Sequence, residues 1–181
     1  MGLAAMGLAF LAATLEGAGD AAHSDYESSR LVTYLVVVSG LGVAVSAIGL
    51  GGVREGVLLG AAAGLFWAVS DTSIKALSDE LGEAGAAAIL FSPLAAVIAL
   101  ASAAGLVVSA RSLQVGKAVP VIAVTSVAAN ALTIATGPLV FTEPFPEDPL
   151  GAMVRVSAFA LVVVAAALTP APVKAAHLES A

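Results

Sequence analysis

The residues best suited to chemistry are polar and ionisable side chains inside long apolar stretches. Ser70, Asp71 and Lys75 come together in one of them. An ionisable group inside a membrane span is costly and usually has a function, such as carrying a proton or binding a substrate. Asp71 and Lys75 are four residues apart, so they share a helix face and could pair. The alternative is a position at the membrane interface, with Lys75 reaching out to the headgroups.

A second polar group recurs at helical spacing in the apolar stretch 119–141. Ser126, Asn130 and Thr133 form a stripe there, with Asn130 close to the middle of the stretch. Two interpretations are open. The stripe lines a substrate cavity, or it bonds a neighbouring helix, a contact that contributes on average ~0.6 kcal/mol in lipid. We take Ser70, Asp71, Lys75, Ser126, Asn130 and Thr133 as candidates for a substrate cavity.

Motifs of soluble enzymes are absent from the sequence. It contains no H-E-x-x-H, no G-x-S-x-G and no phosphate-binding loop. There is no cysteine, so there is neither a thiol nucleophile nor a cysteine metal site. No basic run indicates nucleic-acid binding. We therefore expect no enzyme activity, no catalytic residue, no metal and no cofactor, with membrane lipid and a small molecule or ion as partners.

The composition points to a membrane protein. Of the 181 residues, 60% are hydrophobic and 11% are charged, whereas a soluble domain carries roughly 25% charged residues. With so few charges the chain cannot cover a globular surface with polar groups. We therefore expect an all-α, polytopic helix bundle whose exterior faces lipid.

Apolar runs of about 20 residues, the length that spans a bilayer, give the predicted helices. Five are predicted, at 31–52, 57–76, 84–110, 119–141 and 150–168. A sixth stretch, 2–15, is too short to span alone. It is a partial helix, or else a signal peptide or interfacial segment. A signal peptide needs a positive start, and no Lys or Arg precedes Arg30.

We expect about six transmembrane helices in three parts. Residues 1–30 form a partial first helix and an outer loop, residues 31–169 a five-helix unit, and residues 170–181 a disordered tail. Arg54, Arg111, Lys117 and Lys174 fall on one side of an up-and-down path, while most acidic residues and Arg30 fall on the other. Because cytoplasmic loops collect Lys and Arg, we expect a multi-pass plasma-membrane protein with a cytoplasmic C-terminus.

Three glycines, Gly56, Gly60 and Gly64, form a double G-x-x-x-G pattern on one helix face. Small residues at this spacing let two helix backbones approach closely in lipid. We predict a helix-packing seam along this face.

Residues 54–170 resemble the C-terminal repeat of the drug/metabolite transporter superfamily, the EamA-like permeases. Residues 54–71, with Lys75 after them, are similar to the small-residue helix of that repeat, which ends in a polar cluster and a lysine. Residues 110–121 resemble its connection AL-x-x-G-x-A-x-x-V. Residues 137–144 resemble its helix end G-x-x-x-F-x-E, and Gly151 leads a final apolar helix as in the family.

The resemblance implies one five-helix EamA-like repeat, preceded by the end of another. Family members pair two inverted repeats, and the substrate cavity is expected between them near mid-membrane. The chain is then a permease, or the C-terminal half of one, that moves a small metabolite, drug or ion by alternating access. A missing N-terminal repeat or a homodimer would complete the cavity. The alternative is a non-transporting membrane fragment or assembly partner.

If Asn130 lines the cavity, Asn130→Leu should abolish uptake of substrate into proteoliposomes and leave folding intact. The substitution replaces the polar amide with an apolar side chain of similar size. Normal uptake by this variant would remove Asn130 from the site.

Overall fold

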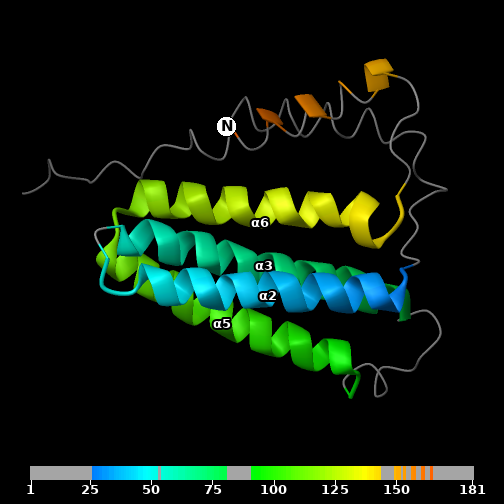
Figure 1. Cartoon of the computed structure of the whole chain (residues 1–181), viewed down its shortest axis with the longest axis horizontal. Coiled ribbons are helices and arrows are strands. Elements are labelled where there is room, and N and C mark those ends of the chain that lie inside the picture. Colours follow the sequence, from blue (N-terminus) through cyan, green and yellow to red (C-terminus); the bar gives the residue numbers. More distant parts are fainter. Residues whose placement is uncertain are drawn as a thin grey trace, which may run out of the picture.

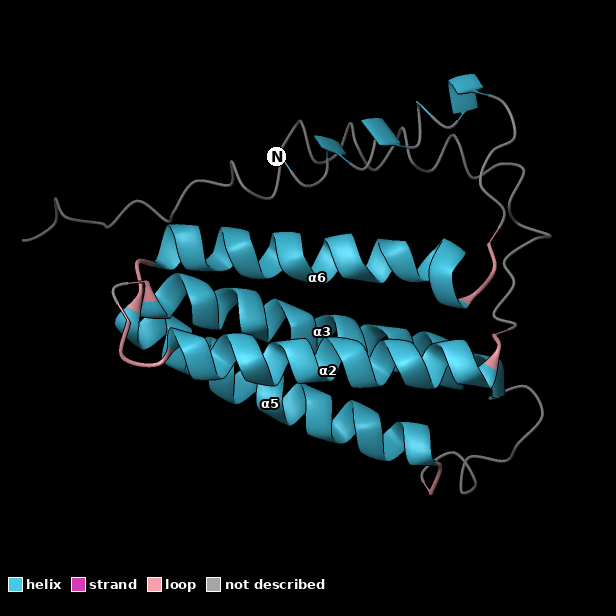
Figure 2. Cartoon of the chain, in the orientation of Figure 1, coloured by secondary structure: helices cyan, strands magenta, loops and turns pink. Residues whose placement is uncertain are grey.

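A computed structural model describes residues 26–52, 54–80 and 91–143, together with short helical pieces at 149–151, 153, 156–157, 160–161 and 164. Over these residues the chain is helical and has no strand (Figure 2). The four helices are α2 (Ser28–Gly49), α3 (Glu55–Glu80), α5 (Pro93–Val115) and α6 (Ala118–Val140). Each is long and apolar enough to cross a membrane. The prediction of an all-α chain with helices long and apolar enough to span a membrane is thus confirmed, while the predicted helix at 2–15, most of that at 150–168 and the tail lie outside the described residues.

The four helices run up and down (Figure 1). Helices α3 and α6 run in one direction, and α2 and α5 run in the other. The connections α2–α3 and α5–α6 therefore meet at one end, which we call the basic end because Arg54, Arg111 and Lys117 lie there. The opposite end, with Glu27, Arg30 and Glu143, is called the acidic end.

Helix α3 is the centre of the bundle. In its most apolar stretch 61% of the residues are buried, against 22% in α2, 11% in α5 and 6% in α6. Each of the other helices packs on α3 and makes few contacts with its other neighbours. The α2 face that packs inward carries Leu31, Leu35 and Val38, which join Val69 and Ala76 in one apolar cluster. The spacing of the three α2 residues is that of one helix stripe.

Two helices have ends that differ from those that the apolar runs predict. Helix α3 continues from the predicted end at Ala76 to Glu80. Helix α5 begins at Pro93 rather than at Ala84, since Phe91 and Ser92 are not helical. The Ser92 side chain accepts a hydrogen bond from the N–H of Ala95, and proline fits the first helical position because it has no N–H to satisfy. The hydrophobicity of a stretch alone predicts neither of these helix ends.

The glycine seam of α3 contacts both the α5–α6 turn and α6. A Cβ on Gly56 would collide with the backbone of Gly116. A Cβ on Gly64 would lie 2.7 Å from the Ala128 Cβ. Between them, the Thr125 hydroxyl donates to the Gly60 carbonyl at 2.8 Å, a contact that only a close backbone approach allows. The three glycines therefore set the distance between α3 and its neighbours at the basic end.

We predict that Gly64→Ala lowers the free energy of unfolding by about 1–3 kcal/mol, because the added methyl group overpacks the contact with α6. The measurement is unfolding in mixed detergent micelles. The matched control is Gly40→Ala on α2, where a Cβ would meet nothing within 4 Å. Alanine should there be neutral or stabilising by its better helix propensity. Equal effects at the two positions would contradict the seam.

Candidate functional site

The acidic half of the bundle contains a polar group shared by three helices. It consists of Tyr34 from α2, Asp71 and Thr72 from α3, and Thr133 from α6, and we call it the three-helix polar group. The Asp71 carboxylate lies beside the hydroxyl of Thr133, and the Tyr34 hydroxyl lies beside that of Thr72, near enough to Asp71 to be affected by its charge. Asp71 is on the same side of α3 as the glycine seam, two turns beyond Gly64. At Asp71 that side is exposed rather than closed.

Two hydroxyls of this group are buried without a hydrogen bond. Tyr34 Oη and Thr133 Oγ1 have no water-accessible surface and find no hydrogen-bond partner among the residues that the structure describes. Thr72 differs, because its hydroxyl donates to the Ala68 carbonyl at 2.7 Å within its own helix. Buried hydroxyls are usually hydrogen-bonded, and an orphaned one calls for an explanation.

The three-helix polar group lies well inside the span. Tyr34 is six residues from the start of α2 and Thr133 seven from the end of α6, which places both about 10 Å from the acidic end at 1.5 Å per residue. Asp71 is nine residues from the end of α3, or about 14 Å. The sequence-based estimate placed Asp71 closer to the interface because it ended the helix at Ala76. The extension to Glu80 places the carboxylate further from the end of the helix.

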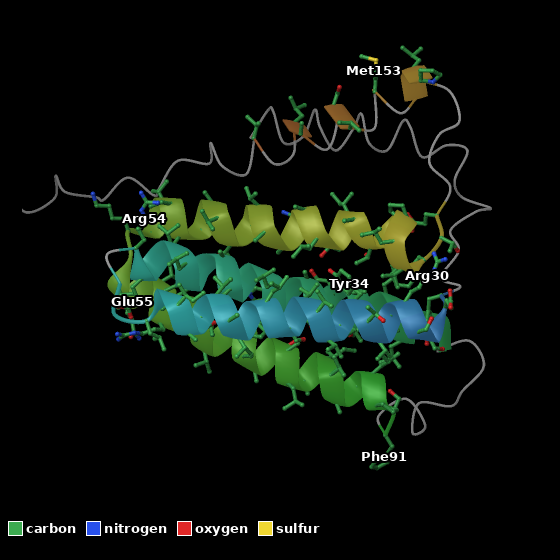
Figure 3. The ribbon with its side chains drawn as sticks, viewed as in Figure 1. Arg30, Tyr34, Arg54, Glu55, Phe91 and Met153 are labelled. Carbon is green, nitrogen blue, oxygen red and sulfur yellow. The ribbon has the colours of Figure 1, made fainter. Side chains whose placement is uncertain are left out.

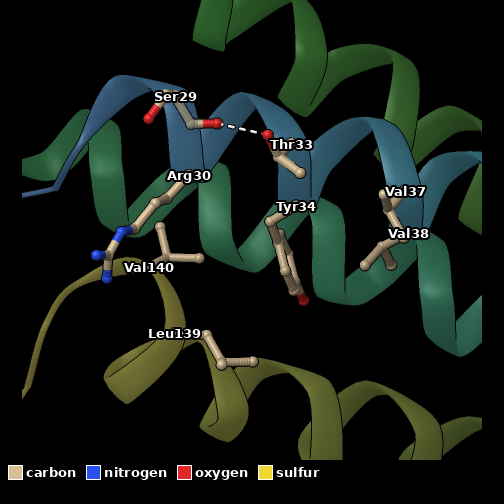
Figure 4. A pocket seen from close by; sticks show the side chains of 8 residues that line it. All are labelled: Ser29, Arg30, Thr33, Tyr34, Val37, Val38, Leu139 and Val140. Atoms are coloured by element: carbon tan, nitrogen blue, oxygen red, sulfur yellow. Dashed lines mark hydrogen bonds between the residues drawn. The ribbon is translucent and has the colours of Figure 1, made fainter.

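A groove between α2 and α6 opens beside Tyr34 (Figure 4). Its volume is about 350 Å³. The Tyr34 ring points into it from α2. Its walls are mainly apolar, with a polar rim toward the acidic end. The lining residues are Ser29, Arg30, Thr33, Tyr34, Val37, Val38, Leu139 and Val140. Tyr34 thus belongs both to the groove and to the three-helix polar group.

Lys75, one turn above Asp71 on α3, pairs with a carboxylate from another segment. Its ammonium forms an ion pair with Glu143, which follows α6, and lies 4.3 Å from the centre of the Phe141 ring. Phe141 is fully buried and packs edge-on against Tyr26 at a centroid distance of 6.2 Å. We call Lys75, Phe141 and Glu143 the latch. It ties the end of α6 to α3.

The turn after α6 aims Glu143 at Lys75. Thr142 has a φ of 49°, a left-handed conformation that is uncommon for a residue with a side chain. It lets the chain reverse, so that the N–H of Glu143 donates to the Gly137 carbonyl at 3.0 Å. The Glu143 carboxylate lies directly over Gly137, where a Cβ would collide with it. Gly137 therefore makes room for the latch.

The other ends of the helices are paired as well. At the basic end Arg111 on α5 binds Glu55 on α3 at 3.0 Å. Figure 3 shows Glu55 at this end and Arg30 at the other. Arg30 pairs with Glu27 at 2.9 Å. The Ser29 hydroxyl and the Arg30 guanidinium together hold the pKa of Glu27 below its ordinary value, so this contact is kept at neutral pH and is lost only as the pH falls through the lowered pKa.

The structure separates the six predicted cavity residues. Asp71 and Thr133 lie together. Lys75 pairs with Glu143 and not with Asp71. Ser70 is buried on another side of α3, where its hydroxyl and that of Ser102 on α5 are 2.9 Å apart. Asn130 is exposed on α6 and Ser126 partly so, and neither takes part in the close contact that Gly64 makes with Ala128.

Sequence reasoning missed Tyr34 and Glu143. Tyr34 stands alone in an apolar stretch, and an aromatic residue there reads as packing. Glu143 was placed in a loop after the helix, and only the left-handed turn at Thr142 brings it back to α3. The sequence did carry a signal for Glu143, because Gly137 and Glu143 belong to the motif G-x-x-x-F-x-E.

Comparisons with known proteins give no neighbour for this chain. No family model, no curated protein and no solved structure matches it.

For the latch we predict a coupling free energy of up to about 1 kcal/mol between Lys75 and Glu143. The Lys75 side chain is 39% exposed and that of Glu143 23%, so the pair should behave much like an exposed ion pair. The measurement is a double-mutant cycle of unfolding with Lys75→Met and Glu143→Gln. Additive effects of the two substitutions would show that the pair does not hold α6 on α3.

Proposed function

We propose that this chain is an integral membrane permease of the drug/metabolite transporter type, or the C-terminal half of one. It moves a small metabolite, drug or ion by alternating access. The observation that carries the proposal is the Asp71 carboxylate, which has no ion pair among the described side chains and lies near Tyr34, a residue that lines the groove between α2 and α6. Ionisable groups at such depth usually mark a substrate or ion pathway.

The two ends of the bundle support a rocking motion. At the basic end, glycine contacts and the bond from Thr125 to Gly60 hold α3 and α6 tightly. At the acidic end, the contact between α3 and α6 depends on the latch, whose ion pair is partly exposed and costs little to break. With a tight seam at one end and a weaker contact at the other, α6 can tilt about the seam. Such a tilt would expose Asp71 first to one side of the membrane and then to the other, as alternating access requires.

The orientation and the second wall of the cavity belong to the same proposal. The basic end faces the cytoplasm, and the C-terminus lies on that side of the plasma membrane. The chain contributes about six transmembrane helices, and the bundle belongs to its one EamA-like repeat. A preceding repeat or a second copy of the chain provides the facing half of the cavity, toward which Ser126 and Asn130 point on the exposed side of α6.

The test is uptake into proteoliposomes that contain the full chain. A panel of radiolabelled amino acids, amines, nucleosides and sugars is offered, and protein-free vesicles supply the background. We expect saturable uptake of at least one solute. Asp71→Asn should lower its rate at least about tenfold, the effect of losing about 1.4 kcal/mol of transition-state stabilisation. The protein should elute and unfold normally.

Glu55→Gln is the matched control, because it neutralises a carboxylate on the same helix outside the groove. It should leave uptake within about twofold of the unmodified protein, since a partly exposed pair contributes little. Uptake that is unchanged by Asp71→Asn would contradict the proposal. Background rates for every solute would favour the alternative of a non-transporting assembly partner, for which an exposed amide near the middle of α6 is the supporting observation.

A further inference from the structure

We propose that the three-helix polar group binds the ammonium of a primary amine, with the apolar part of that ligand in the groove between α2 and α6. This inference rests on the proposed function, since it names the class of substrate that the site would take.

Charge is the first reason. Five charged side chains are described near the acidic end, and four of them form two pairs, Arg30 with Glu27 and Lys75 with Glu143. Asp71 has no such partner among the described side chains. Both nearby cations are neutralised, so they do not repel a cation at Asp71. An ionised carboxylate in lipid is costly unless a positive charge offsets it, and a bound cation provides that charge.

Hydrogen bonding is the second reason. An ammonium has three N–H donors and no acceptor. The three-helix polar group offers the Asp71 carboxylate and the hydroxyl oxygens of Tyr34 and Thr133. Those two hydroxyls have no hydrogen-bond partner among the described residues, although they are buried. An ammonium would first meet the exposed Asp71 carboxylate, and it would satisfy the two hydroxyls only after the side chains that cover them shift to admit it. A proton on Asp71 would neutralise the charge but would leave at least one hydroxyl without a partner.

Shape is the third reason. The groove has a volume of about 350 Å³ and meets the polar group at Tyr34. Val37 and Val38 line it beyond Tyr34, while Leu139 and Val140, the last two residues of α6, line it nearer the acidic end (Figure 4). Such a surface favours an alkyl or aromatic body of modest size. A bare metal ion would use the oxygen atoms and leave the apolar part of the groove without a role.

A ligand carboxylate would have to compete for its natural partner. The guanidinium that lines the groove belongs to Arg30, whose Nε is paired with the Glu27 carboxylate at 2.9 Å. A zwitterionic amino acid would share that guanidinium with Glu27, whereas an amine without an acidic group needs no such partner. The site therefore favours an amine without an acidic group.

The experiment is equilibrium dialysis of radiolabelled n-hexylamine against the full chain in zwitterionic lipid nanodiscs, with empty nanodiscs subtracted. We expect saturable binding at pH 7. Asp71→Asn should raise the Kd at least about tenfold, because a hydrogen bond to a charged group is lost. Tyr34→Phe and Thr133→Val should each raise it about fivefold, the effect of one neutral partner. Glu55→Gln should leave it unchanged.

Two competitors test the chemistry of the head. Hexan-1-ol keeps the apolar body and lacks the charge, and it should not displace the label. Hexyltrimethylammonium keeps the charge and lacks the N–H donors, and it should displace the label only weakly. Equal binding by the Asp71→Asn protein, or equal displacement by hexyltrimethylammonium, would overturn the inference.

Failure of the inference and failure of the transport proposal can be told apart. Asp71-dependent uptake of a solute without amine binding would support the permease proposal and refute the proposed amine site. Amine binding that depends on Asp71, with background uptake of every solute, would leave the binding site and refute the permease.

Discussion

The close approach of helix backbones to α3 is the constraint on which the rest of the structure depends. In lipid, burial of apolar surface does not drive helices together, so contact relies on shape and on hydrogen bonds. The small residues of α3 provide the shape, at Gly56 and Gly64 and at the fully buried Ala62, Ala63 and Ala68. The bonds from Thr125 to Gly60 and between Ser70 and Ser102 add directional contacts on two sides. Because the other three helices touch α3 more than each other, loosening this helix would release all of them.

The glycine side of α3 also explains why the opening lies where it does. Gly56, Gly60 and Gly64 repeat every four residues and then stop. The next residue at that spacing is Ala68, which is fully buried, and nearly one turn further along lies Asp71, whose side chain cannot lie in a close backbone contact and stays exposed. The same face thus closes on α6 in its first half and leaves room beside α6 in its second. The latch then restores contact at the very end of the two helices.

Much of the fold could be predicted from the sequence, and the site only in part. The predicted span 119–141 differs from α6 by one residue at each end, because clear helix-end signals lie on both sides of its apolar run. The start of α5 was misplaced by nine residues because the alanine-rich run before Pro93 is as apolar as the helix itself. Asp71 and Thr133 were predicted from residue type and spacing. Tyr34 could not be, because its role depends on which face of α2 meets the gap beside α6, a tertiary property.

The central place of α3 has a consequence for how the chain enters the membrane. By mean hydropathy it is the least apolar of the four described spans, and it carries Asp71 and Lys75. A charged residue at the centre of a span opposes insertion by about 2.5–3.5 kcal/mol. The more apolar α2 precedes α3 in the chain, and α5 and α6 follow it. Among these four helices, translocation machinery would thus meet the strongly inserting α2 directly before the reluctant α3. Ser70 and Asp71 of α3 then reach their neighbours Ser102 on α5 and Thr133 on α6 only after both of those helices have been made.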